Sequence, residues 1–170
     1  MFLPVHHHLR NRSNLGFTLT ELLLVMGISA ILLSFGFVNL LGLTRRVYLT
    51  TTLNTLISDL RSQQADAMNG YAADGITPDT YGIYFTSASY ILFRGNTYNP
   101  SDPTNFTVTL SSPLQFTNIT FPGNQVVFNQ GSGEINGFAS GQNALSLTNP
   151  QDGQTKTVTL DQFGAVIVVN

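Results

Sequence analysis

The sequence predicts an α+β protein in which a long N-terminal helix packs on an antiparallel β-sheet or a small β-sandwich. Three observations lead to this fold class. An uncharged run occupies residues 22–43, an amphipathic helical period continues through residues 44–70, and from residue 80 onward the apolar period falls to two. Helices repeat their faces every 3.6 residues and strands every two. The 170 residues suffice for one anchored domain, with the β-rich head in residues 71–170.

A short polar leader, residues 1–16, precedes the uncharged run. It contains Arg10, Arg12 and three adjacent histidines at positions 6–8. Three neighbouring histidines in a segment with no predicted element form no defined metal site, so we expect no metal there.

The uncharged run is long enough to cross a bilayer. Its 22 residues correspond to about 33 Å of helix, so residues 17–43 are predicted to form a transmembrane helix. Glu21 stands at the leading edge of this segment. An acidic side chain inside a membrane helix costs on the order of 2.5–3.5 kcal/mol, so a carboxylate placed here calls for a partner.

The stretch Gly16-Phe17-Thr18-Leu19-Thr20-Glu21 resembles the class III signal of type IV pilins and type II secretion pseudopilins. In that pattern Gly16 is the last residue of the leader, Phe17 the first residue of the mature chain, and Glu21 the fifth. The resemblance implies cleavage after Gly16 by a prepilin peptidase and N-methylation of Phe17. It also implies that Glu21 pairs with the terminal ammonium of a neighbouring subunit when the helix enters a filament core.

The same resemblance implies the location and the partners of the chain. The head would lie outside the cytoplasm on a single-pass helix in the bacterial inner membrane, and later in a pilus or pseudopilus. The partners would be other pilin or pseudopilin subunits, the peptidase and methyltransferase, and the inner-membrane assembly platform. Charge alone does not set the orientation, because Arg10 and Arg12 are balanced by Arg45 and Arg46. The alternative is an ordinary signal anchor with a stray glutamate.

The second half of the helix carries one apolar stripe. Its members recur three or four residues apart, which predicts packing of this face on the sheet: Leu49, Leu53, Leu56, Ile57, Leu60, Ala67, Met68 and Tyr71. Asn69-Gly70 predicts the end of the helix. Gly36 and Gly42 predict a weak region within its first half.

Eight strands are predicted in the head from alternating apolar residues and turn signals between them. They cover Tyr81–Phe85, Tyr90–Arg94, Phe106–Leu110, Phe116–Phe121, Gln125–Asn129, Ala144–Thr148, Lys156–Leu160 and Ala165–Val169. Short turns between the last three predict a meander.

The head is similar to the GspH/FimT group of minor pseudopilins. The similarity rests on residues 127–131 (Val-Phe-Asn-Gln-Gly) with a second glycine at Gly133, and on the final segments 156–160 and 163–166. It implies a minor subunit. The alternatives are a major pilin, or a minor pilin that binds DNA or a surface.

No catalytic constellation is found in the sequence. The chain has no cysteine and no histidine after the leader, which excludes the usual triads and zinc sites, so we expect neither an enzyme nor a cofactor. Asp74, Asp79 and Asp102 could meet at a calcium site, but solvated loop carboxylates are the preferred interpretation.

The charge of the mature chain argues against nucleic-acid binding. Two of the seven basic residues lie in the leader and all nine acidic residues follow it, which leaves −4 on the side chains after Gly16. Arg61, Arg94 and Lys156 are too few to neutralise the roughly six to ten phosphates of a strong DNA complex. Charged residues make up only 9% of the chain, against about 25% in typical soluble domains.

Overall fold

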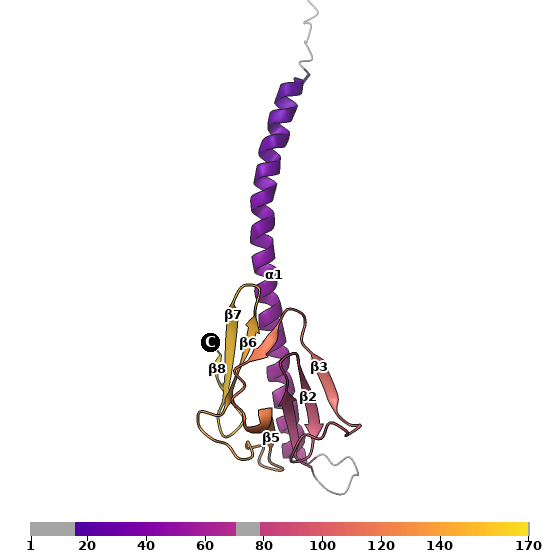
Figure 1. Cartoon of the computed structure of the whole chain (residues 1–170), viewed down its shortest axis with the longest axis vertical. Helices are drawn as coiled ribbons and strands as arrows, with labels where there is room; N and C mark the ends of the chain where they lie inside the picture. Colours follow the sequence, from indigo (N-terminus) through magenta and orange to yellow (C-terminus); the bar gives the residue numbers. More distant parts are fainter. Residues whose placement is uncertain (1–15, 71–78, 170) are drawn as a thin grey trace, which may run out of the picture. The chain divides into compact units, whose positions relative to one another are not determined.

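The computed structural model describes residues 16–70 and 79–169, and the side chains of these residues except 35–47 and 168–169. The chain divides into two compact units, Met1–Leu43 and Thr44–Asn170. One helix, α1 (Leu19–Asn69), passes through both, and all the described strands belong to the second unit (Figure 1). The predicted α+β class is confirmed.

Helix α1 is a single element of 51 residues. It runs without interruption through Gly36 and Gly42, so the weakness predicted there does not break the helix in the isolated chain. The helix ends at Asn69, as predicted. Gly70 follows with φ +62°, the left-handed conformation in which glycine terminates helices, and its N–H donates to the Ala67 carbonyl oxygen.

The head contains two four-stranded antiparallel sheets, with strand orders β3-β2-β1-β5 and β4-β6-β7-β8. The strands are β1 (Tyr81–Phe85), β2 (Ser89–Arg94), β3 (Phe106–Thr109), β4 (Gln115–Thr117), β5 (Gln125–Phe128), β6 (Ala144–Asn149), β7 (Gln154–Leu160) and β8 (Val166–Val169). All eight predicted strands and the final meander are confirmed. The strand predicted over Phe116–Phe121 is shorter than expected. β4 ends at Thr117, because Asn118 has φ +50° and leaves the extended conformation.

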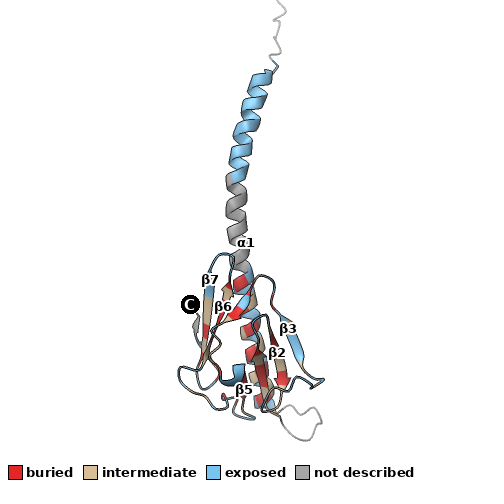
Figure 2. Cartoon of the chain, viewed as in Figure 1, coloured by how far each residue is buried: buried red, intermediate tan, exposed pale blue. Residues whose placement is uncertain are grey.

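The core of the head lies between α1 and the inner faces of both sheets (Figure 2). Five members of the predicted stripe are buried: Leu49, Leu53, Leu56, Leu60 and Ala67. They meet Ile83, Phe85, Val126 and Phe128 of the first sheet and Leu145, Leu147, Val158 and Leu160 of the second. The prediction for Met68 is wrong, since that side chain is half exposed, and Tyr71 lies outside the described residues.

The loop between β2 and β3 covers the outer face of the first sheet. Tyr98 of this loop stacks on Tyr84 with ring centroids 4.3 Å apart and meets Phe93 edge-on at 5.7 Å. Phe93 in turn lies over Gly82, where any side chain would collide with its ring. This aromatic cluster holds the loop against the sheet without charged residues.

Candidate processing and assembly site at the helix N-terminus

Thr18 fixes the first residue of α1. Its hydroxyl oxygen accepts a hydrogen bond from the Glu21 N–H at 3.2 Å, and its carbonyl oxygen accepts the first helical bond from the Leu22 N–H at 3.1 Å. The Thr20 hydroxyl lies 3.1 Å from that of Thr18. Threonine followed three residues later by glutamate is the capping-box pattern, which satisfies N–H groups that lack a helical partner. The helix therefore cannot begin earlier without losing this cap.

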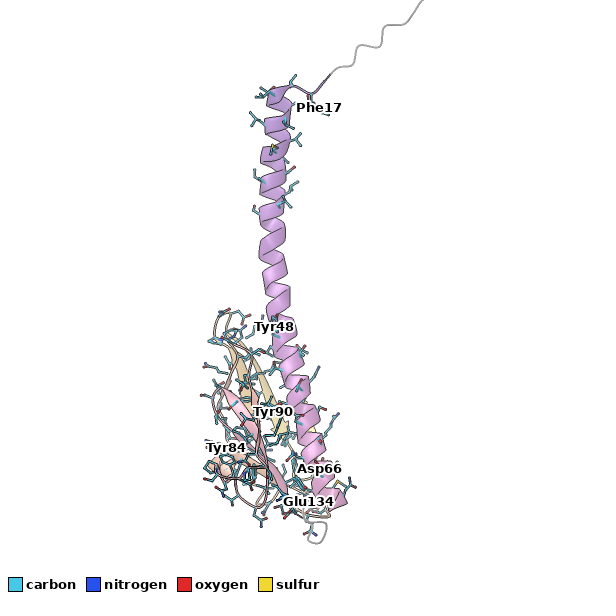
Figure 3. All side chains as sticks on the ribbon, turned by 90° about the vertical axis from the view of Figure 1, so that its right-hand side faces the viewer. Phe17, Tyr48, Asp66, Tyr84, Tyr90 and Glu134 are labelled. Carbon is cyan, nitrogen blue, oxygen red and sulfur yellow. The ribbon has the colours of Figure 1, made fainter. Side chains whose placement is uncertain are left out.

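Gly16 and Phe17 consequently lie outside the helix. Phe17 is 84% exposed, and a side chain built on Gly16 would meet no atom within 4 Å (Figure 3). The peptide bond between them is therefore outside the helical hydrogen-bond ladder, and among the described residues no atom packs against the Cβ position of Gly16. Exposed non-helical backbone of this kind is where proteolytic cleavage concentrates.

Glu21 lies in the first turn of α1 and is exposed. A carboxylate at this position is stabilised by the positive end of the helix dipole. Among the side chains that the structure describes, which exclude 35–47, no cationic group forms an ion pair with it. The structure thus places Gly16, Phe17 and Glu21 around one helix terminus, where no described cationic side chain neutralises the carboxylate.

The helix behind this terminus exposes apolar side chains on all sides (Figures 2 and 3). More than half of each of the following side chains is accessible: Leu19, Leu22, Leu23, Leu24, Val25, Met26, Ile28, Ile31, Leu32 and Leu33. A helix that is apolar all round belongs in lipid or in a protein core, since water-exposed patches of this extent mark interaction surfaces.

No helix in the described part of the chain is long and apolar enough to cross a membrane. The predicted transmembrane segment runs to residue 43, and the side chains of residues 35–43 lie outside those described.

Two of the three acidic residues considered for calcium binding have partners within the head. Asp79 forms an ion pair with Arg94 at 3.2 Å, and Asp102 accepts hydrogen bonds from the hydroxyl and the N–H of Thr104. Those two bonds, the hydroxyl first, lower the pKa of Asp102. Asp74 lies outside the described residues. Across the described ranges, no group of three metal-ligating side chains occurs.

One buried titratable group connects α1 to the first sheet. The Tyr90 hydroxyl donates to Oδ2 of Asp59 at 2.5 Å. Burial, followed by this bond and the negative charge of Asp59, raises the pKa of Tyr90 well above its ordinary value. Tyr90 is therefore a neutral donor that fixes the helix on β2, and it has no accessible face for catalysis, being 1% exposed.

Among the residues around the helix terminus, Thr18 is the one that the sequence interpretation missed. The signal was present as threonine three residues before Glu21. The same residues resemble a cleavage signal and also encode the start of a helix, so the cap is hidden within the longer motif.

Residues 11–37 match the family model described as the prokaryotic N-terminal methylation motif. No curated protein and no solved structure matches the chain. The matched residues include the cleavage-signal stretch, the capping box and the beginning of the apolar helix. The match supports the type IV pilin and pseudopilin superfamily and points to a structural subunit.

Proposed function

We propose that this chain is a prepilin-like structural subunit, processed after Gly16 and assembled through its N-terminal helix into a type IV pilus or type II secretion pseudopilus. The observation that carries the proposal is the exposed Phe17 and the non-helical Gly16–Phe17 bond, directly before a capped helix whose first turn carries the exposed carboxylate of Glu21. The methylation-motif match over residues 11–37 supports the same function.

Hydrolysis of the Gly16–Phe17 bond adds water across it and leaves a carboxylate on Gly16 and an ammonium on Phe17. The new ammonium then begins the mature chain, and methylation of its nitrogen leaves its positive charge in place. In a filament core, this ammonium and Glu21 of a neighbouring subunit leave water together. Burying either charge alone would cost several kcal/mol. The filament arrangement in which the ammonium contacts Glu21 is therefore favoured over arrangements that leave either charge unpaired.

Before assembly, residues 17–43 hold the subunit in the bacterial inner membrane as a single-pass helix with the head outside the cytoplasm. Two features support this location: the uncharged run of 22 residues, and the exposed apolar side chains on the helix between Leu19 and Leu33. The prepilin peptidase and methyltransferase act there, and the inner-membrane assembly platform then moves the subunit into the filament.

Within this class we favour a minor subunit similar to the GspH/FimT group. The supporting feature is the loop that contains Gly131 and Gly133. The Gln64 side-chain amide donates a hydrogen bond to the carbonyl oxygen of Gly133, which fixes this loop to α1. The alternatives are a major pilin and a minor pilin that binds DNA or a surface.

Replacement of Glu21 tests the proposal. The Glu21→Ala chain is expected to insert and to be processed normally, but to be lost from sheared filaments, because the neighbour's ammonium has no counter-charge. Glu134→Ala, which removes an exposed carboxylate from a loop of the head, is the matched control and is expected to assemble normally. Equal filament incorporation of the two variants contradicts the role proposed for Glu21.

A further inference from the structure

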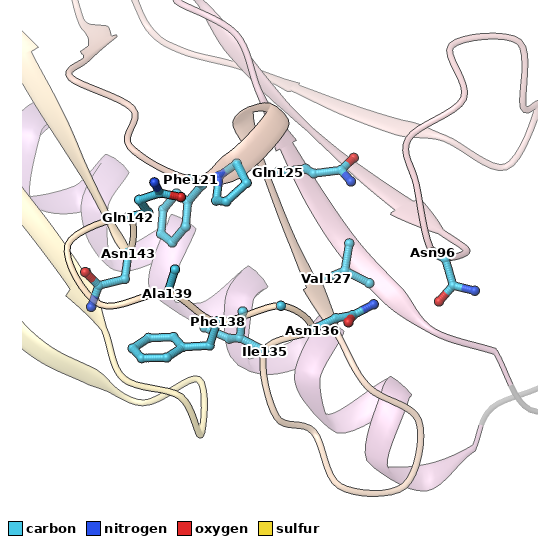
Figure 4. A pocket seen from close by; sticks show the side chains of 12 residues that line it. Asn96, Phe121, Gln125, Val127, Ile135, Asn136, Phe138, Ala139, Gln142 and Asn143 are labelled. Carbon is cyan, nitrogen blue, oxygen red and sulfur yellow. The ribbon is translucent and has the colours of Figure 1, made fainter.

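A cavity of about 210 Å³ opens on the head between the short η1 turn (Pro122–Asn124) and the loop that follows Ile135 (Figure 4). Phe121, Pro122 and Phe138 form much of its apolar wall. Several carboxamide side chains line the rest, among them those of Asn136 and Gln142. None of the lining residues is charged.

The wall of the cavity is held in place by bonds that do not depend on a ligand. The Asn143 side chain donates to the Leu160 carbonyl oxygen at 2.5 Å and accepts the Gly141 N–H at 3.1 Å. Phe121 is 4% exposed and stacks on Phe85 with ring centroids 5.8 Å apart. The site is therefore largely formed before a ligand binds, and little of the binding free energy would be spent on ordering the cavity wall.

Two of the lining carboxamides are available to a ligand. Asn136 and Gln142 are exposed, and within the described residues their side-chain amides form no hydrogen bond. Each amide offers two donors and one acceptor oxygen. Beside the phenylalanine and proline surfaces, they suit a ligand that is neutral, apolar on one face and rich in hydroxyl groups at its edge.

We propose that this cavity binds one neutral pyranose ring, either as a free sugar or as the end residue of a glycan. The C–H face of such a ring packs on the accessible carbons of Phe138 and Pro122, while its hydroxyl groups pair with carboxamides. A charged ligand finds no counter-ion in the cavity and would be desolvated without compensation. The volume lies below the roughly 300–1,000 Å³ of sites for larger ligands, which limits the ligand to a single ring. This recognition is independent of filament assembly.

The test uses the full-length chain in detergent micelles and the neutral methyl glycosides of glucose, galactose, mannose, N-acetylglucosamine and N-acetylgalactosamine. At least one glycoside is expected to bind at millimolar concentration and to shift the side-chain amide NMR signals of Asn136 and Gln142. Asn136→Ala and Gln142→Ala are each expected to weaken binding about tenfold, since each removes hydrogen bonds to the ligand. Gln151→Ala, an exposed amide in the turn after β6, is the matched control and should leave binding unchanged.

A second arm compares the binding glycoside with the same sugar at the end of an oligosaccharide, and the tighter of the two identifies the natural source. The proposal is overturned if no glycoside binds the folded chain, or if the two alanine variants bind as tightly as the control. It is also overturned if crosslinking from position 142 in filaments shows the cavity filled by a neighbouring subunit.

Discussion

The Thr18 hydroxyl caps the helix directly after the Gly16–Phe17 bond, at which we propose cleavage. We expect Thr18→Ala to cost about 1 kcal/mol of local helix stability, because the Glu21 N–H loses its acceptor. Hydrogen exchange of the Glu21 and Leu22 amides in micelles should then accelerate severalfold. Thr18→Ser keeps an oxygen at the same position and serves as the control. Equal exchange in the alanine and serine variants would show that the cap does not define the helix start.

Gly164 is required by a close approach and by its backbone conformation. Its φ is +76°, and a Cβ there would lie 2.7 Å from Nε2 of Gln64 and 2.8 Å from the ring of Phe128. We expect Gly164→Ala to lower the free energy of unfolding by about 2 kcal/mol or more, since steric overlap adds to left-handed strain.

Gly153→Ala is the matched control for that experiment. Gly153 has φ +69° but no atom within 4 Å of its Cβ position, so only the conformational cost of about 1 kcal/mol applies. Urea unfolding of the full chain measures both variants. Equal losses would mean that the contact with Gln64 and Phe128 does not constrain position 164.

Tyr90 makes the stability of the head sensitive to alkaline pH. Because the folded state raises the pKa of this phenol above its ordinary value of 10.0, the stabilisation is complete below that pH. This stabilisation is lost progressively as the pH rises above 10.0, because Tyr90 then releases its proton in the unfolded chain and retains the proton in the folded chain. We expect the free energy of unfolding to fall more steeply from neutral pH to about pH 11 in the native chain than in Tyr90→Phe. Parallel pH profiles would contradict the raised pKa of the buried Tyr90 phenol.

At the scale of elements, the two halves of α1 differ in what covers their leucines. Leu56 is fully buried against the sheets, whereas Leu24 is 62% exposed. We expect Leu56→Ala to lower the free energy of unfolding of the head by about 2–5 kcal/mol, through lost burial and a cavity. The same change at Leu24 should leave the stability of the head unaltered in micelles. Equal effects in urea unfolding would show that the stripe is not the core face of the helix.

The positions of the elements could be predicted from the sequence because they depend on local patterns. Alternating apolar residues and turn signals predicted each strand of the described residues, and Asn69-Gly70 predicted the end of the helix. The pairing of β1 with β5 and of β4 with β6 could not be predicted, since hydrogen bonds between segments far apart in the chain leave no local period. The division of the head into two sheets follows from those pairings.

The helix also packs two glutamines on the head that its apolar stripe did not indicate. Gln63 is 8% exposed, and with its amide in the orientation that its neighbours require, the nitrogen donates to the carbonyl oxygens of Gly82 and Phe93. Gln64 donates to the carbonyl oxygens of Gly133 and Phe163. An amide satisfied by backbone groups of distant strands, as for Gln63, or of distant loops, as for Gln64, cannot be recognised from hydropathy, because the partners are brought near only by the fold.

The N-terminal candidate site could be predicted from the sequence because its chemistry is local. Gly16, Phe17 and Glu21 lie within six consecutive residues, and their arrangement follows from one helix start. The carboxamide cavity could not be predicted, since its wall combines Phe121 and Pro122 with a loop some fifteen residues later. Only the folded head brings these segments together.

At the scale of the whole molecule, the chain combines a self-sufficient core in the head with an apolar helix surface that requires other molecules. The head buries its own leucines and aromatic rings, and its acidic and basic groups are few. The first half of α1 has no such cover among the described residues. This contrast is what a subunit needs if it is first held in a lipid bilayer and then transferred into a helical filament core.

Intact-mass and N-terminal peptide mass spectrometry of the protein isolated from its native filaments or membranes tests the central claim most directly. The account predicts a chain that begins at Phe17 and carries one methyl group on its terminal nitrogen, with residues 1–16 removed. An assembled chain that still begins at Met1, with Phe17 unmodified, would contradict it.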